Sequence, residues 1–416
     1  MFFRFIYILF FILCFASAQT FHSRNIFMSS EIMMTSSRGN AMGNSGMMVD
    51  NNPFWVGSNP AALSGLEGIQ FSMNTFMHRY KEHRSIKVHD YFGDFLADAS
   101  YVFNDDNYYY NGVAFSFPMI YDKITIGFSN LPFHNFSYNY VEEVHDASYD
   151  LNKDPLVGYH IEKMSGLSYN LSYGLGWKVF DNFAFGLGLN QMHSGNKFLN
   201  SPIFIDRIKS VVVLEQSDNL SSNESYADTI TIKLKTSNFF SYGFLMSFKN
   251  NISIGYNYRE PVYTMEANKL RYTIPSKCSI GILLQPRQEI PASIVFEYDI
   301  QKYSSIDSIF SNSVNLYDKK TYHFGIEYLN SESSIRVGMV YQNSPFQRDL
   351  DEAIFTFGYG KSINGIIVDL SANYSTISYS YPDQFIPDGD ISNPNQYEKV
   401  IESNMGIAMS LTYNFR

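Results

Sequence analysis

Large apolar and small or polar side chains alternate along most of this chain. In 166–180, Leu, Tyr, Trp and Val occupy every second position, and Ser, Asn, Gly and Lys fill the positions between them. The segment 403–415 repeats the pattern. A period of two is that of a β-strand with two unlike faces. A soluble sandwich also alternates, but its exposed face normally carries more charge. The pattern therefore predicts strands with one face toward lipid and the other toward a lumen.

Composition agrees with a membrane β-barrel. Aromatic residues make up 17% of the chain and charged residues only 17%. No stretch approaches about 18 uninterrupted apolar residues, so the sequence predicts no transmembrane helix. The acidic balance, 30 Lys and Arg against 40 Asp and Glu, disfavours a nucleic-acid partner.

The alternation predicts about fourteen strands, an even number that returns both termini to one side of the membrane. They are expected at 68–81, 111–119, 123–140, 166–180, 182–197, 229–248, 252–264, 276–286, 291–304, 321–330, 333–343, 352–362, 365–379 and 403–415. Short turns alternate with long polar connections, expected at 82–110, 148–165, 199–228, 306–320 and 380–402. We therefore predict an all-β fold, a transmembrane antiparallel β-barrel spanning 68–416.

The first residues predict export. Arg4 precedes the apolar run 5–15, and Ala16-Ser17-Ala18 is an A-x-A cleavage site, so we expect 1–18 to be a signal peptide. The bulky Leu13 before Cys14 argues against a lipid-attachment motif. Cleavage would leave Cys278 as the one remaining cysteine, so no intramolecular disulfide is expected.

A Gly-rich, Pro-punctuated segment separates the leader from the first strand. Such a segment suits a place where backbone packs closely inside another structure. Its sequences GNAMGNSGMMVD and SNPAALSG resemble the N-terminal plug of the FadL/TodX family, outer-membrane transporters of long-chain fatty acids and other apolar molecules. The resemblance implies that 19–67 form a plug (hatch) inside a barrel of fourteen strands. The C-terminal LTYNFR also resembles the signal read by the barrel-assembly machinery.

The same resemblance implies passive transport of hydrophobic small molecules across the bacterial outer membrane. It also implies that outer-membrane lipid surrounds the barrel and that no cofactor is needed. A rival reading is a PorV-like barrel whose extracellular loops bind partner or secreted proteins. The polar, acidic segments 199–228 and 380–402 mildly favour that rival. An apolar, ligand-sized cavity between plug and outer loops would favour transport, whereas a filled lumen would favour the rival.

Pro132 falls inside the expected third strand, beside Asn130 and Phe133. Proline cannot donate to a ladder, and a closed barrel has no edge strand, so Pro132 should mark a bulge, a bend or an early strand end. One hypothesis is a kink that opens the wall sideways, as the resemblance implies. The alternative is that the strand has already left the membrane and Pro132 begins a loop.

Asn59-Pro60-Ala61 is the most distinctive motif of the expected plug. It could anchor the plug to the wall and let bound ligand shift it, or it could merely shape the entry into the first strand. In both readings Asn59 should hydrogen-bond to backbone, because a buried amide needs a partner.

Several charged residues are expected to face the lumen. A two-residue turn at 331–332 places Glu327 opposite Arg336, on the face away from Tyr328 and Ile335. We predict an ion pair here, with Asp299 and Asp369 inward on nearby strands. For these charged residues, a structural role in holding plug and wall together is favoured over a role in transport.

Catalysis is not expected. His89-Asp90 and His145-Asp146 resemble fragments of a catalytic pair, but histidines in polar loops are mostly solvated surface. The sequence contains no G-x-S-x-G, HExxH, Walker or dinucleotide motif and no CxxC pair, and no metal site is predicted.

Overall fold

The computed structural model describes residues 30–33, 36–49, 52–120, 123–145, 155–195, 201–214, 226–248, 251–265, 271–285, 291–306, 316–330, 333–346, 348, 350–382 and 397–415. The expected signal peptide, 1–18, lies outside these residues, as do 215–225 and 383–396 in the two acidic connections.

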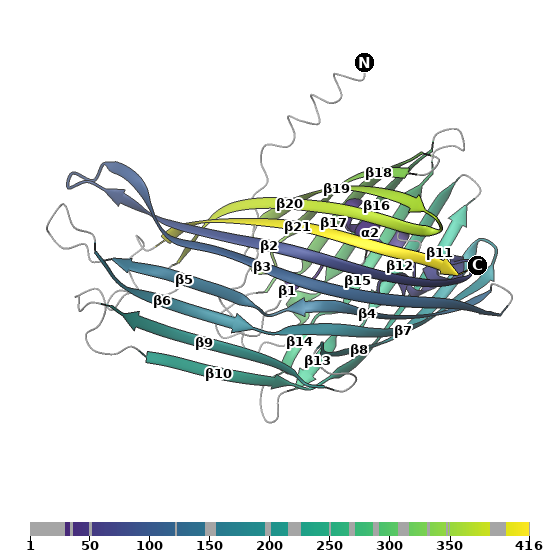
Figure 1. Cartoon of the computed structure of the whole chain (residues 1–416), viewed down its shortest axis with the longest axis horizontal. Helices are drawn as coiled ribbons and strands as arrows, with labels where there is room; N and C mark the ends of the chain where they lie inside the picture. Colours follow the sequence, from purple (N-terminus) through teal and green to yellow (C-terminus); the bar gives the residue numbers. More distant parts are fainter. Residues whose placement is uncertain are drawn as a thin grey trace, which may run out of the picture.

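The described chain forms a closed antiparallel β-barrel of 14 strands, which confirms the predicted fold class (Figure 1). The barrel strands are β2 (Ile69–His89), β3 (Phe95–Ile120), β4 (Ile124–Asn135), β7 (Leu167–Phe180), β8 (Phe183–Ser194), β11 (Ser237–Phe248), β12 (Ile252–Arg259), β15 (Lys277–Leu284), β16 (Ala292–Gln301), β17 (Lys319–Asn330), β18 (Ser333–Asn343), β19 (Asp351–Ile363), β20 (Ile366–Pro382) and β21 (Tyr397–Phe415). Each pairs with the next, and β21 closes the ring onto β2, with Phe415 opposite Ile69. Between β19 and β20, Asn364 and Gly365 both have positive φ, which suits a two-residue hairpin turn.

The barrel strands carry exposed apolar side chains on one face and buried polar side chains on the other, the reverse of the pattern in a soluble protein. On β7, Leu175 and Trp177 are 38% and 45% exposed, whereas Ser172 and Asn170 are buried. The same inversion holds along β21, where Met405 and Ile407 are exposed and Ser410 is buried. A wall with apolar groups outside and polar groups inside is stable only when hydrocarbon surrounds it.

Outside the barrel, a sheet extends from one end of the wall. β5 (Tyr138–His145), β6 (Leu156–Ser165), β9 (Ile203–Val213) and β10 (Tyr226–Leu234) continue beyond the barrel strands, beside the long β2–β3 hairpin (Figure 1). The remaining short elements are the hairpin β13 (Val262–Met265) and β14 (Arg271–Ile274) and the turn η3 (Tyr303–Ser305). The expectation of polar connections at 82–110, 148–165 and 199–228 was therefore wrong in part. Strands outside the membrane need no lipid-facing side, so they lack the regular apolar alternation that identified the others.

The N-terminal segment lies inside the barrel. It comprises β1 (Ser30–Glu31), α2 (Ser37–Ala41), α3 (Gly46–Val49), α4 (Trp55–Ser58) and the 3-10 turn η2 (Pro60–Gly65). α2 contacts β18 to β21, α3 contacts β12, β15 and β16, and η2 contacts β4, β7, β8 and β11. None of the helices in the described part of the chain is long and apolar enough to cross a membrane.

Candidate ligand path through the lumen

Asn59-Pro60-Ala61 touches the inner wall through backbone. Asn59 is fully buried, and its Oδ1 accepts a hydrogen bond from Ala61 N at 3.2 Å, so its side chain starts the η2 turn. On the wall, a Cβ at Gly186 would overlap Ala61 N, and one at Gly176 would overlap Pro60 O. Glycine at these two wall positions therefore allows the plug backbone to lie directly against the barrel.

A buried ion network ties the plug to the wall. Arg38 of α2 donates Nε to Glu327 Oε1 at 3.0 Å and Nη2 to Oε2 at 2.6 Å. Arg336, opposite Glu327 on the neighbouring strand, donates Nε to Glu327 Oε1 at 2.7 Å and Nη1 to Asp369 Oδ1 at 2.6 Å. Arg336 and Asp369 meet across Gly360 of β19, where a Cβ would crowd both side chains. The network thus joins the plug to β17, β18 and β20.

Asp299 lies in a second group, apart from Glu327, Arg336 and Asp369. Its Oδ2 accepts a hydrogen bond from Lys277 Nζ at 2.8 Å and lies 3.2 Å from His323 Nε2. The other His323 nitrogen, Nδ1, lies 2.7 Å from the plug carbonyl of Gly43. The four inward charges therefore do not form one network. Sequence reasoning also missed Arg38, whose only signal was a charge at the start of the Gly-rich segment.

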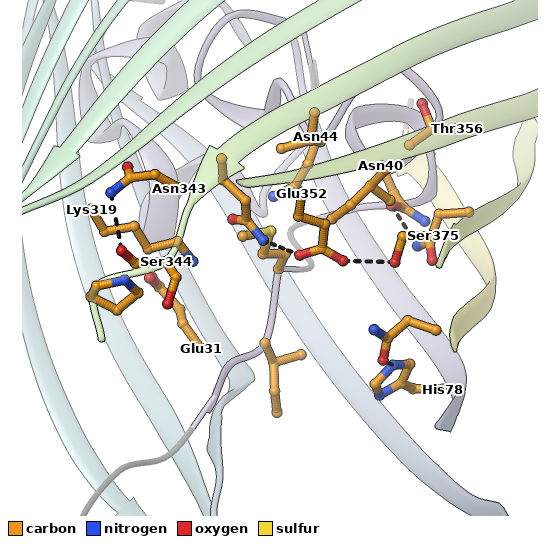
Figure 2. Close-up of a pocket in the computed structure, with 18 of the residues that line it drawn as sticks. Glu31, Asn40, Asn44, His78, Lys319, Asn343, Ser344, Glu352, Thr356 and Ser375 are labelled. Atoms are coloured by element: carbon orange, nitrogen blue, oxygen red, sulfur yellow. Dashed lines mark hydrogen bonds between the residues drawn. The ribbon is translucent and has the colours of Figure 1, made fainter. Parts of the chain in front are cut away.

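An outer cavity of about 170 Å³ lies between the plug and the end of the barrel with the long connections. Figure 2 shows Glu352 near its centre, where it accepts hydrogen bonds from Gln342 and Ser375 at 2.6 Å. Apolar side chains share the lining: Ile32, Met33, Phe76, Tyr110, Val340, Phe346 and Ile354. A dry cavity of about 150 Å³ is large enough to admit benzene. The outer cavity can therefore hold a small aromatic molecule or part of an acyl chain.

An inner cavity of about 130 Å³ borders the outer one. Its lining includes Leu131, Pro132 and Phe133 of β4 and the ionic groups around Asp299. The plug segment 31–33 and Lys319 line both cavities. This segment therefore separates the outer cavity from the part of the wall that contains Pro132.

Backbone pairing between β3 and β4 stops beside Pro132. The last pair joins Val113 of β3 to Asn130 of β4. The next backbone pair of β3 on this side joins Val102 to Glu142 of β5. β4 itself continues along β7, with a register shift between Pro132 and His134. β4, the third barrel strand, therefore continues past Pro132, but its pairing with β3 is interrupted there.

Side chains close the unpaired stretch. Asp106 accepts a hydrogen bond from Asn139 Nδ2 at 3.3 Å, and Asn104 accepts one from the backbone N–H of Val141 at 3.2 Å. Asn130 and Phe133 instead contact other parts of the barrel: Asn130 Oδ1 lies 3.0 Å from His193 Nε2 of β8, and Phe133 packs in a buried apolar cluster. Rotatable side chains separate more easily than a continuous backbone ladder, so this seam should part more readily than the paired seams of β2 with β3 and of β4 with β7.

Over the residues that the structure describes, no three His, Cys, Asp or Glu side chains are grouped as a metal site would require. His89 and Asp90 lie at the tip of the β2–β3 hairpin, whose turn exposes Tyr91 and Phe92. Asp146, the partner proposed for His145, lies outside the described residues.

Similarity to solved structures extends over most of the chain. A Pseudomonas aeruginosa FadL homologue matches with a TM-score of 0.66 at 13% identity, covering 94% of this chain and 100% of that one. The Ralstonia pickettii toluene transporter TbuX matches with a TM-score of 0.57 at 14% identity, covering 92% and 98%. The P. putida toluene transporter TodX matches with a TM-score of 0.58 at 12% identity, covering 88% and 94%. No protein-family model and no curated protein sequence matches the chain. At these identities the likeness establishes a shared fold, the one that the plug motifs suggested.

Proposed function

We propose that this protein is a bacterial outer-membrane channel for passive uptake of hydrophobic small molecules. The observation that carries the proposal is the succession of outer cavity, plug segment 31–33, inner cavity and unpaired wall beside Pro132. A ligand would enter between the outer connections, pass the plug segment and leave sideways into the membrane. Because the wall is apolar outside, hydrocarbon would receive it directly.

The structures with the same fold support this choice, since they include two described as toluene transporters. The exposed apolar side chains of the barrel strands support the proposal that outer-membrane lipid surrounds the barrel. The aromatic end of β21, with Tyr413 and Phe415, supports recognition by the barrel-assembly machinery. Movement is expected to follow the concentration gradient.

A PorV-like role in binding partner proteins would need no space in the lumen. The two cavities therefore favour transport, although their lining mixes polar and apolar groups. Reconstitution separates these functions. Liposomes that contain the protein should take up toluene or laurate faster than empty liposomes, and a deletion strain should take them up more slowly. Equal rates in both comparisons would refute transport and leave the partner-binding role.

Locking the unpaired wall should block sideways exit. In a Cys278→Ser background, Asp106→Cys and Asn139→Cys would place thiols on the two sides of the gap, joined by a short bis-thiol crosslinker. We expect crosslinking to slow uptake at least about tenfold, because the seam could no longer part. The same treatment of Ser333→Cys with Lys361→Cys, which are opposed on paired strands, should leave uptake unchanged. Equal uptake with the gap locked would exclude lateral exit but not transport.

A further inference from the structure

A buried arginine joins two layers at the outer end of the barrel. Arg84 of β2 donates Nε to Glu82 Oε1 at 2.7 Å and Nη1 to Glu398 Oε2 of β21 at 3.0 Å. Its guanidinium also lies 4.9 Å from the centre of the Tyr140 ring of β5 and 5.9 Å from that of the Tyr381 ring of β20. A guanidinium over an aromatic face is attracted to it. Arg84 therefore holds β5 against β2, β20 and β21.

Two tyrosines of β5 complete this contact. Tyr138 donates its hydroxyl to Glu82 Oε2 at 2.9 Å, on the side of the carboxylate away from Arg84 Nε. Tyr138 and Tyr140 also pack in a buried cluster with Tyr80 and Val102. We call the residues that meet here the outer joint: Glu82, Arg84, Tyr138, Tyr140, Tyr381 and Glu398.

The outer joint continues the inward faces that line the outer cavity. His78 of β2 and Asn404 of β21 belong to the cavity lining. Arg84 and Glu398 lie six positions further along the same two faces, toward the outer end. On the outward face of β2, the charged and exposed Arg79 already replaces the apolar residues, so the outer joint lies beyond the hydrocarbon. The joint thus closes the cavity on the outer side of these strands.

The layer held by this joint is a separate sheet. β5, β6, β9 and β10 form this sheet, which we call the flap (Figure 1). Its edges have little backbone attachment: β5 shares one pair with β3, Val102 with Glu142, and β10 pairs within the described chain only with β9. At its base, strand pairing is interrupted at Ser137 and Gly166, and Phe136 N donates to Gly166 O at 2.9 Å. Interruptions at one level in neighbouring strands are where a hinge motion can be absorbed.

The charges of the outer joint keep it from holding the flap strongly. Burial raises the pKa of Glu398, although Arg84 opposes this, and the carboxylate of Glu142 raises it further. The ionised carboxylate is therefore unfavourable while the joint is closed. A buried ion pair whose desolvation offsets its attraction contributes little net stability. The joint can close the flap without fixing it permanently.

We propose that the flap is a hinged gate, held shut by the outer joint, which controls entry into the outer cavity. This inference rests on the proposed function and adds the regulation of its entrance. In the closed state, Arg84 and the tyrosines fill the space between the flap and the outer ends of β2, β20 and β21. Separation of Tyr138 and Tyr140 from the wall would turn the flap outward at its base and open the cavity to the outside.

A thiol in the outer cavity would report access from outside. In a Cys278→Ser background, Val340→Cys would place one there, because Val340 lines the cavity and is 1% exposed. A bulky, charged maleimide added to intact cells that produce the protein should label this thiol slowly. The labelling rate measures the entrance and does not depend on a sideways exit or on transport.

Releasing the flap side of the joint should speed labelling. Tyr138→Phe together with Tyr140→Leu removes the hydroxyl donated to Glu82 and the ring that faces Arg84, while the ion pairs within the wall remain. We expect labelling to become about tenfold faster. Tyr109→Leu is the matched control, because this tyrosine of β3 is 68% exposed and lies outside the joint, and it should not change the rate. Each variant should keep the electrophoretic mobility of a folded barrel.

Fixing the flap should have the opposite effect. Glu82→Cys with Tyr138→Cys, joined by a short, reducible thiol crosslinker, would tie β5 to β2 across the joint. Toluene uptake into liposomes should fall at least about fivefold and recover when the crosslink is reduced. The same treatment of Glu143→Cys with Tyr159→Cys, which are opposed within the flap, should leave uptake unchanged.

The outcomes separate the gate from the proposed function. If the released variant labels no faster than the wild type, or if the crosslink leaves a measurable toluene uptake unchanged, the flap is a fixed part of the wall and the inference fails. Faster labelling of the released variant, together with no toluene uptake by any form, would refute transport and leave the gate.

Discussion

Glu327→Gln should destabilise the protein by about 3–5 kcal/mol, the usual cost of removing one partner from a buried ion pair. Glu327 is fully buried and is the carboxylate shared by Arg38 of the plug and Arg336 of the wall. Glutamine keeps the shape but leaves two guanidinium groups with only Asp369 to balance them. Thermal unfolding, followed by the change in electrophoretic mobility of the folded barrel, should shift clearly downward.

The matched control lies on the surface. Asp105→Asn breaks the ion pair with Arg79, in which both side chains are 40% exposed. Solvent screens such pairs, so this change should cost at most about 1 kcal/mol. Similar losses in the two variants would mean that burial does not govern the contribution of the Glu327 network.

Gly186→Ala should force the plug away from the wall. The added methyl group would overlap the backbone of Pro60 and Ala61, and backbone cannot turn aside as a flexible side chain can. Overpacking of this kind costs about 1–3 kcal/mol when the structure adjusts. We expect the plug to shift and the barrel to leak, which swelling of liposomes in a small sugar would detect.

Gly57→Ala supplies the comparison within the plug. A Cβ at Gly57 would have its nearest neighbour, Leu131 Cδ1, at 3.7 Å, an ordinary van der Waals distance. This variant should therefore remain sealed and as stable as the wild type, since alanine also favours the α4 helix. If Gly186→Ala also stays sealed and stable, the contact of Asn59-Pro60-Ala61 with the wall does not hold the plug in place.

Outward and inward positions could be read from the sequence because lipid imposes a local rule. Every second residue of a membrane strand must be apolar, and this rule identified the faces of β7 and β21 before any contact was known. A short turn also set the register of one hairpin, which placed Glu327 opposite Arg336. Where lipid is absent, as in the outer parts of β2 and β3, the rule no longer applies and the strands were missed.

Proline signalled an irregular place in the wall, but not its form. A residue without an N–H disturbs a ladder wherever it falls, so a disruption near Pro132 followed from its chemistry. That pairing with β3 ceases after Asn130 while pairing with β7 continues depends on how the neighbouring strands diverge. The N-terminal strand beside this edge had no sequence signal.

By itself, the sequence determined the class of fold, the polarity of the two wall faces and the opposition of Glu327 and Arg336. Only the tertiary structure decided which plug residue meets which part of the wall. Arg38 reaches Glu327 across 289 positions, and Glu31 reaches Arg259 across 228. Such contacts have no period along the chain, because they arise only after the barrel closes around a plug of particular shape. The division of the inward charges into two groups follows from that closure.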